Sequence, residues 1–240
     1  MNRYQAATLH FLGSASVLFL IFALVRWIWY PGPLFFAASG ANLLGIITGV
    51  DVVLGPLIML IIFNPKKKSL KFDIACVLVC QLGFMAYGSW SIFEARPVYI
   101  AFAENHFQLV TANEIEDADL AKASNPEFRH LPWLGPKTVG TKAPTDSKQR
   151  DEILFAGASG MGLPNLPQYY VPYAEIMPQV QRAALPLTDM KRISTEDIQR
   201  LKDYLADAKN QPLNFVPMRS KRRMLYAAID PKTGALLGIL

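Results

Sequence analysis

The sequence predicts a membrane protein in which three N-terminal transmembrane α-helices precede a small α+β extracytoplasmic domain. Three apolar runs occupy the first third of the chain, and each is long enough to span a bilayer, which takes about 20 residues. Acidic, basic and histidine side chains are scarce over residues 9–63, where they are limited to His10, Arg26 and Asp51. Because a water-soluble domain keeps solvated charges on its outer faces, these runs indicate helices surrounded by lipid.

The net charge of +5 does not indicate a nucleic-acid partner. Residues 1–93 hold six basic and two acidic side chains, which leaves +4, whereas residues 94–240 hold 18 basic and 17 acidic ones, which leaves +1. The excess therefore lies beside the apolar runs, where it determines membrane topology. We expect no binding of nucleic acid.

The apolar runs predict a three-helix transmembrane domain over residues 1–96 and a second domain over residues 97–240. The predicted spans cover about residues 9–30, 41–63 and 72–93. A cleavable signal peptide is the alternative interpretation of the first run. Against it, no small-residue cleavage site follows the apolar core, and Arg26 with the aromatic residues after it forms an interfacial anchor instead.

The short loops between the spans predict the direction of the chain. The loop at residues 31–40 carries no charge, whereas the loop at residues 64–71 carries four lysines. These are Lys66, Lys67, Lys68 and Lys71. Since positively charged short loops stay in the cytoplasm, we expect a cytoplasmic N-terminus and a periplasmic C-terminal domain in a multi-pass protein of a bacterial inner membrane.

Asp51 lies near the middle of the second span, where a carboxylate is costly unless it is paired, protonated or beside water. We hypothesise a contact between the helices that joins Arg26 to Asp51, because a long arginine side chain can cover much of a depth difference of about 9 Å. Two alternatives stay open. In one, Arg26 extends to the membrane surface and Asp51 is neutral; in the other, Asp51 serves transport or a proton relay.

A stripe of small residues runs along the second span. Ala41, Gly45 and Gly49 recur every four residues, a spacing that lets another helix approach closely. Asp51 points about 200° away from Gly49, so the span offers a small-residue face and a polar face. The favoured interpretation is packing within the three-helix domain. The alternative is that one face receives the transmembrane helix of a client protein.

Gly55 and Pro56 follow Asp51 on the same span. Gly55 lies on the side of the helix that carries Asp51. Pro56 has no N–H to donate to the carbonyl of Val52, so we expect a kink near Gly55.

The second domain begins with a predicted β-hairpin of residues 98–102 and 107–111. A short acidic helix is predicted from Asn113 toward Ala123. Residues 125–186 are rich in proline and glycine, which predicts loops with brief helical turns.

The last fifty residues predict a helix and a second hairpin. Ser194 to Asp197 have the form of a capping box, which begins an amphipathic helix. Residues 224–229 and 235–239 predict a C-terminal hairpin around the turn at residues 230–234.

We recognise no catalytic, cofactor-binding or metal-binding motif. The histidines lack ligand spacing, and the glycine-rich stretch at residues 157–162 lacks the lysine of a phosphate loop, which predicts a flexible loop. Cys76 and Cys80 are interpreted as small, buried packing residues. The basic run at residues 219–223 predicts a solvated or membrane-facing edge, and anionic membrane lipid is the partner that it would attract.

Several long blocks of residues resemble the TfpX/TfpZ family of type IV pilin accessory proteins, which includes FimB-like fimbrial assembly proteins. The blocks that carry the resemblance are Trp29–Pro31, Gly49–Leu57, Phe63–Asp73, Ala95–Val98 and Ala112–Ile115. The resemblance covers most of the chain and is densest from the second span to the start of the second domain. It implies a non-enzymatic inner-membrane accessory factor that assists assembly or stability of a major type IV pilin.

The resemblance also implies partners. These are the major pilin and other membrane proteins of pilus assembly. From the layout of the chain we hypothesise that it contacts both the helix and the head domain of the pilin. The alternative function is a small membrane enzyme or transporter subunit that uses Asp51, with Gln81 and Tyr87 from the third span. Three helices are few for a transport path, and no catalytic pair is visible in the sequence.

Overall fold

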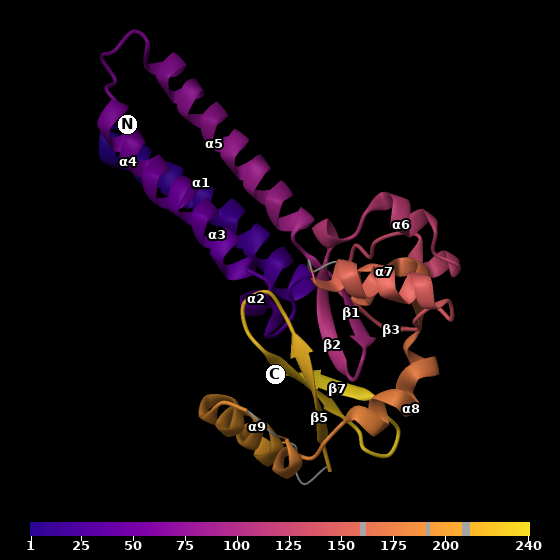
Figure 1. Cartoon of the computed structure of the whole chain (residues 1–240). Coiled ribbons are helices and arrows are strands. Elements are labelled where there is room, and N and C mark those ends of the chain that lie inside the picture. Colours follow the sequence, from indigo (N-terminus) through magenta and orange to yellow (C-terminus); the bar gives the residue numbers. More distant parts are fainter. Residues whose placement is uncertain (159–161, 191–192, 208–211) are drawn as a thin grey trace. The chain divides into compact units, whose positions relative to one another are not determined.

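The computed structural model describes residues 1–158, 162–190, 193–207 and 212–240. The chain divides into two compact units, Met1–Arg96 and Pro97–Leu240, which we call the helical unit and the α+β unit. Figure 1 labels helices and strands of both units where there is room. The predicted fold class is confirmed, since apolar helices that are long enough to span a membrane precede a mixed domain of helices and strands.

The helical unit contains three helices that are long and apolar enough to cross a membrane: Arg3–Trp29, Gly40–Ile62 and Leu70–Glu94. The first two each include a π-helical segment, and a short helix connects them. Their parts are α1 (Arg3–Leu24), η1 (Val25–Trp29), α2 (Leu34–Ala37), α3 (Gly40–Thr48), η2 (Gly49–Leu54) and α4 (Gly55–Ile62); the third helix is α5 (Leu70–Glu94). We call the continuous helix Gly40–Ile62 the middle helix.

Helix α1 begins at Arg3, six residues before the apolar run that starts at Leu9. The reason is a capping box at Asn2. The backbone N–H of Gln5 donates to Asn2 Oδ1 at 2.9 Å, and the backbone N–H of Asn2 donates to Gln5 Oε1 at 2.9 Å. Two N–H groups that the first helical turn cannot pair are thereby satisfied.

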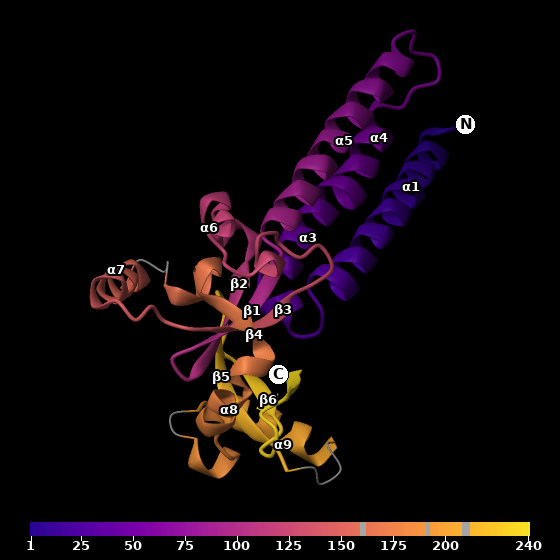
Figure 2. The ribbon, with the colours of Figure 1, turned by 90° about the vertical axis from the view of Figure 1, so that its right-hand side faces the viewer.

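Helices α1 and α5 both pack on the middle helix (Figure 2). Gly88 of α5 permits a close approach, since a Cβ there would lie 2.6 Å from Cγ1 of Ile47. The hydroxyl of Tyr30, which is fully buried, donates to the carbonyl of Ile92 at 2.8 Å. One hydrogen bond thus joins the connection after η1 to the end of α5.

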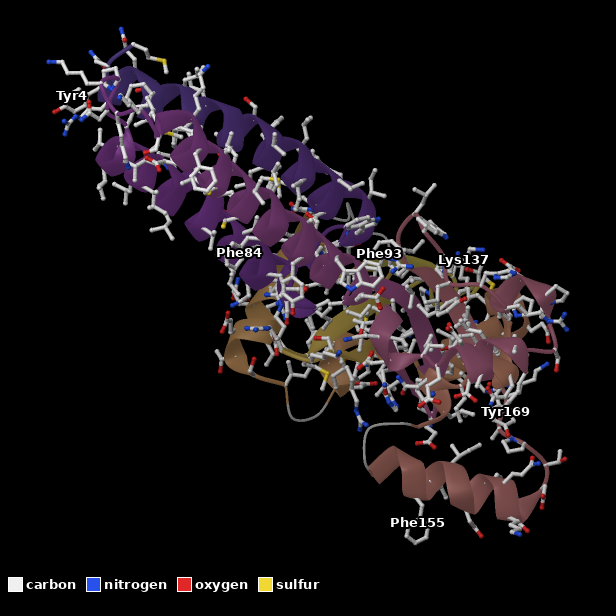
Figure 3. All side chains as sticks on the ribbon, turned by 90° about the horizontal axis from the view of Figure 1, so that it is seen from above. Tyr4, Phe84, Phe93, Lys137, Phe155 and Tyr169 are labelled. Carbon is white, nitrogen blue, oxygen red and sulfur yellow. The ribbon has the colours of Figure 1, made fainter. Side chains whose placement is uncertain are left out.

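Large apolar side chains cover the outside of the helical unit. Phe84 is 60% exposed and projects from α5 (Figure 3), and other such residues are Phe19, Leu20, Ile61 and Val79. Water would meet a continuous apolar surface there, which soluble proteins avoid. Lipid is the solvent that this surface fits.

The α+β unit contains a mixed sheet of seven strands among its described residues, in the order β4-β3-β1-β2-β5-β6-β7. The strands are β1 (Pro97–Ala103), β2 (His106–Thr111), β3 (Lys137–Thr141), β4 (Tyr170–Pro172), β5 (Asn214–Arg219), β6 (Leu225–Ile229) and β7 (Leu236–Ile239). β3 runs parallel to β1, and β5 runs parallel to β2; the other neighbours are antiparallel.

Both predicted hairpins are confirmed. β1 pairs with β2 through a two-residue turn in which Glu104 and Asn105 have positive φ angles of 49° and 68°, as the tight primed turns require. β6 pairs with β7 around the turn at residues 230–234. The positive φ of 76° at Gly234 brings its Cα against Met177 of a neighbouring helix, where a Cβ would lie 2.3 Å from the Met177 carbonyl oxygen.

The prediction of loops over residues 125–186 is wrong for much of that stretch. It contains β3, β4, α7 (Ser147–Ala158) and α8 (Tyr173–Ala183). The short strand β3 has little alternation of its own and is held by pairing with β1, which is distant in sequence. Gly140, a residue that suggested a loop, instead lets α8 lie on the strand, since a Cβ there would be 2.3 Å from Ile176 Cγ1.

The predicted acidic helix is shorter than expected. A 3₁₀ turn at Ala112–Glu114, η3, comes first, and α6 covers only Asp117–Ala121. Of the glycine-rich stretch at 157–162, residues 159–161 lie outside the described residues. The remaining turns are η4 (Pro126–Phe128), η5 (Leu163–Asn165), η6 (Pro167–Tyr169) and η7 (Leu187–Asp189).

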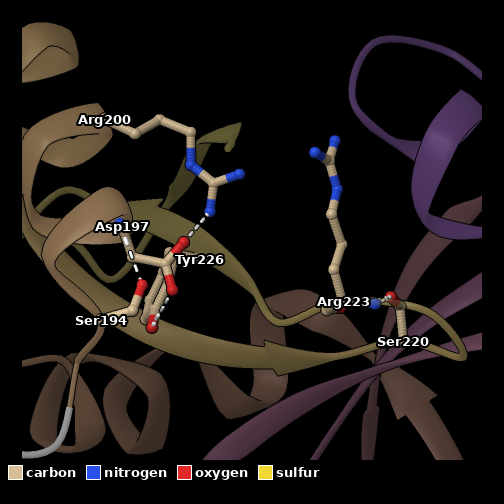
Figure 4. A network of polar contacts seen from close by, with 6 residues as sticks. All are labelled: Ser194, Asp197, Arg200, Ser220, Arg223 and Tyr226. Atoms are coloured by element: carbon tan, nitrogen blue, oxygen red, sulfur yellow. Dashed lines mark hydrogen bonds and ion pairs between the residues drawn. The ribbon is translucent and has the colours of Figure 1, made fainter.

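The predicted helix after Ser194 is confirmed as α9 (Thr195–Asp207). The backbone N–H of Asp197 donates to Ser194 Oγ at 3.1 Å, and the Asp197 carboxylate binds Arg200 and accepts from the Tyr226 hydroxyl at 3.4 Å (Figure 4). This network joins the start of α9 to strand β6. Leu201, which is fully buried, packs α9 onto the same part of the sheet.

A second hydrophobic cluster lies around β1. Tyr99 stacks edge-to-face on Tyr170 with ring centroids 5.0 Å apart and on Phe128 at 6.4 Å. The Tyr99 hydroxyl donates to the carbonyl of His130 at 3.3 Å. Burial raises the pKa of Tyr99 to about 12, with a smaller contribution from the charge of Glu127. This tyrosine therefore stays neutral in the core at physiological pH.

Gly140→Ala should lower the free energy of unfolding of the α+β unit by about 1–3 kcal/mol, because the new methyl group would overlap the buried Ile176 side chain. Thermal denaturation of the full chain in detergent, followed by circular dichroism, measures the loss. Adding Ile176→Val should make the combined loss smaller than the sum of the single losses.

Gly157→Ala is the matched control for that substitution. Its Cβ would meet nothing nearer than the Gly162 Cα at 3.7 Å, and alanine favours a helix by about 1 kcal/mol relative to glycine. Equal losses from the two alanine substitutions would contradict the packing role of Gly140.

Candidate functional site

Asp51 is buried inside the helical unit with only 1% of its surface exposed. It lies in η2 of the middle helix. Neither carboxylate oxygen has a hydrogen-bond partner among the described residues. Burial of a charge without a partner is expensive, so the groups around this carboxylate define the candidate site.

The backbone at Asp51 is π-helical, and Pro56 leaves the Asp51 carbonyl without a backbone donor. The N–H of Gly55 donates to the carbonyl of Val50, which is the five-residue register of a π-helix. In that register the backbone N–H of residue 56 would donate to the Asp51 carbonyl. Residue 56 is a proline, which has no N–H. Gln81 Nε2 of α5 donates to this carbonyl instead, at 3.4 Å. The sequence predicted a kink near Gly55, whereas the feature that the structure shows there is the π-helical segment Gly49–Leu54.

Gly55 makes room for the polar side chains. A Cβ at this position would lie 1.9 Å from Gln81 Nε2 and 2.8 Å from His10 Nε2. The absence of a side chain thus allows His10 of α1 and Gln81 of α5 to approach the middle helix from two sides. We call His10, Asp51 and Gln81 the polar cluster.

The polar cluster borders a cavity of about 410 Å³ whose remaining lining is mostly apolar. His10 Nε2, both Asp51 carboxylate oxygens and Gln81 Oε1 are buried without a hydrogen-bond partner among the described residues. Polar groups that converge in a cavity of this size are the usual mark of a binding site. Within the described residues no three His, Cys, Asp or Glu side chains are grouped to hold a metal ion.

The hypothesised contact between Arg26 and Asp51 is not formed. The Arg26 guanidinium carbon lies 5.9 Å from the centre of the Phe35 ring. Arg26 is three residues from the end of its helix at Trp29, whereas Asp51 is eleven residues from the matching end of the middle helix at Gly40. At 1.5 Å per residue their depths differ by about 12 Å.

His10 lies with Asp51 at this cavity, which the sequence did not predict. It lies seven residues from the end of its helix at Arg3, and Asp51 lies eleven residues from the matching end at Ile62. The depths differ by only about 6 Å. The sequence signal for this neighbour is the similar depth of His10 and Asp51, measured from the helix ends that lie on the same side of the membrane.

Gly45 and Gly49 are exposed on the surface of the helical unit. A Cβ on either would meet nothing within 4 Å. Neither glycine therefore serves the packing of the three helices, which was the favoured interpretation. Within the unit the close approach occurs at Gly88 and Ile47 instead. The small-residue face stays open to a further helix.

The predicted lysine loop connects α4 to α5. Its four lysines, Lys66, Lys67, Lys68 and Lys71, are all exposed. Lys67 Nζ lies 2.5 Å from the Asp73 carboxylate in the first turn of α5, so one of these charges is partly offset.

Cys76 and Cys80 are exposed, so the prediction that they are buried packing residues is wrong. Both lie beside a second cavity of about 240 Å³ between α5 and the middle helix. The reason is that α5 contacts its neighbours along a narrow face and buries few of its residues.

The chain is similar to fimbrial assembly proteins of Dichelobacter nodosus. The protein of serogroup E1 is 28% identical over 229 residues, which cover 93% of this chain and 89% of that protein. The protein of serogroup I has the same identity and coverage. The protein of serogroups C1 and C2 is 32% identical over 117 residues, 48% of this chain and 89% of that protein.

No protein-family model matches the chain. No solved structure matches it either.

Gly55→Ala should destabilise the helical unit by about 1–3 kcal/mol, because its methyl group would displace the Gln81 amide and leave the Asp51 carbonyl without its donor. Gln81→Ala should cost a similar amount. The double variant should cost little more than Gln81→Ala alone, since both changes remove the same hydrogen bond. Thermal unfolding of the full chain in detergent measures all three.

Gly49→Ala is the control on the same helix, and it should cause no loss because open space surrounds its Cβ. Strictly additive losses for Gly55→Ala and Gln81→Ala would show that Gly55 acts independently of the polar cluster.

Proposed function

The chain belongs to the fimbrial assembly protein family, and we propose that it is a non-enzymatic, chaperone-like protein of the bacterial inner membrane that assists assembly or stability of a type IV pilin. The observation that carries this proposal is the similarity to fimbrial assembly proteins over 93% of the chain. The apolar surface of its three helices supports the membrane location.

The two units match the layout of such a client. A pilin before assembly has a helix in the inner membrane and a globular head outside the cytoplasm. We propose that the helical unit contacts the pilin helix and that the α+β unit contacts the head. Exposed apolar side chains on the α+β unit support the second contact: Trp133, Leu134 and Phe155 are 71%, 81% and 84% exposed, and Phe155 projects outward from α7 (Figure 3).

Gly45 and Gly49 are the proposed contact for the pilin helix. Their spacing of four residues permits a close approach of helices in lipid. They are exposed, and no side chain of the chain itself fills the space beside them. A second helix could therefore lie against this face without any rearrangement of the helical unit.

Gly45→Leu combined with Gly49→Leu should reduce recovery of the pilin with the purified chain at least about fivefold, because the bulky side chains hold the two helices apart. The thermal stability of the chain itself should not fall, since both Cβ positions face open space. Quantitative immunoblotting of pilin after affinity purification in detergent measures the effect.

Two further variants serve as controls for the double variant. Gly83→Leu places the same side chain at an exposed glycine of α5 with open space around it and should leave pilin recovery unchanged. Gly88→Leu should unfold the helical unit by collision with Ile47. Full pilin recovery with the Gly45 and Gly49 double variant would remove this interface.

We propose that the N-terminus is cytoplasmic and the α+β unit periplasmic, because the exposed lysine loop carries the positive charge that stays inside. A reporter enzyme that is active only outside the cytoplasm should be active when fused after Ser124. In spheroplasts, Lys66, Lys67 and Lys68 should not react with an amine reagent that cannot cross the membrane. An inactive reporter together with labelled lysines would reverse the orientation.

A further inference from the structure

One wall of the cavity beside the polar cluster is a single face of α1. Ala6, Leu9, His10, Gly13, Ser14 and Val17 line it at spacings of three and four residues, which places them in one stripe along the helix. Three of these six residues are small, as at contacts where membrane helices approach closely.

The opposite wall is a single face of α5. Ile74, Leu78, Gln81, Leu82 and Met85 line it with the same spacing. Each wall extends over twelve residues, which are eleven steps of 1.5 Å or about 17 Å of helix. The cavity is therefore an elongated groove, three helical turns long, between two stripes that both border the middle helix. We call it the α1–α5 groove.

The floor of the α1–α5 groove carries acceptors that need donors. The two Asp51 carboxylate oxygens and Gln81 Oε1 are buried and have no partner among the described residues. Asp51 and Gln81 are only 1% and 9% exposed. His10 Nε2 is the one further buried polar side-chain atom of the cluster without a partner in the described part of the chain. Acceptors thus outnumber donors at this place.

We propose that the α1–α5 groove binds one transmembrane helix of a partner protein whose inserted face carries a hydrogen-bond donor, a hydroxyl, amide or ammonium group, at the level of Asp51. The shape fits because the α1 stripe, which carries small residues, and the α5 stripe border a space open to a third helix. The chemistry fits because a donor would satisfy the buried acceptors, whose isolation in a bilayer is costly. A lipid acyl chain has no donor and would leave them unpaired.

This site is distinct from the small-residue face. On the middle helix Gly49 is exposed whereas Asp51 is buried, and neither Gly45 nor Gly49 lines the groove. The proposal goes beyond pilin contact through Gly45 and Gly49, and either site can fail without the other.

Two synthetic transmembrane peptides of leucine and alanine provide the probe. They differ only at the central residue, which is asparagine in one and leucine in the other. The full chain in lipid nanodiscs, with peptide kept too dilute to associate with itself, should bind the asparagine peptide about 5-fold to 30-fold more tightly by energy transfer. Equal affinity for the two peptides, or binding of neither, would overturn the proposal; the second result is the one expected if lipid fills the groove.

Variants of the chain locate the binding. Asp51→Leu should abolish the preference for asparagine, and Asp51→Asn should weaken it while keeping one acceptor oxygen. Gly13→Leu fills the α1 wall, where a Cβ meets nothing within 4 Å, and should weaken both peptides by the same factor. Gly45→Leu, on the other face, should change neither affinity. If the preference for the asparagine peptide survives Asp51→Leu, Asp51 is not the acceptor and the proposal is wrong. If the Gly13→Leu variant binds both peptides as tightly as the parent chain does, the peptide helix does not bind in the α1–α5 groove.

Discussion

The helical unit depends on the need to satisfy polar groups inside a bilayer. Water cannot pair a carbonyl there, so every missing backbone donor must be replaced by another protein group. Pro56 removes a donor, the middle helix changes to a π-helical register, and Gln81 from another helix donates to the Asp51 carbonyl at 3.4 Å. One proline thereby determines which side chain of α5 must face the middle helix.

Gly55 follows from the same constraint. Once Gln81 must reach the Asp51 carbonyl, a side chain at position 55 would occupy the place of its amide. The glycine that makes this room also admits His10, and the polar cluster forms around a backbone position without a Cβ. Close packing explains Gly88 in the same way, because Ile47 fills the space beside it. Gly45 and Gly49 have no such explanation within the chain, which is why a partner is the simplest reason for them.

Much of the fold could be predicted because it depends on local patterns. Hydrophobic length predicted the three membrane helices, alternation and turn residues predicted both hairpins, and Ser194 predicted the start of α9. What could not be predicted depends on contacts between distant residues. β3 is a strand because β1 lies beside it, and Gly140 reads as a loop residue until Ile176 is seen against it. In the site, Asp51 was recognised as unusual from its own position, but its neighbour His10 comes from a helix forty residues earlier.

The polar cluster bears on the choice between an assembly factor and a membrane enzyme or transporter. A proton relay needs a chain of titratable groups that leads to water on both sides, and the described helices offer His10 and Asp51 beside an otherwise mostly apolar cavity. Buried acceptors without donors suit a different task, since they gain most when a partner supplies the missing hydrogen bond. Such a site binds lipid weakly. It binds more tightly to a helix that carries a hydrogen-bond donor at the depth of Asp51. That selectivity is what an assembly factor needs if it must hold one kind of subunit in the membrane and later release it.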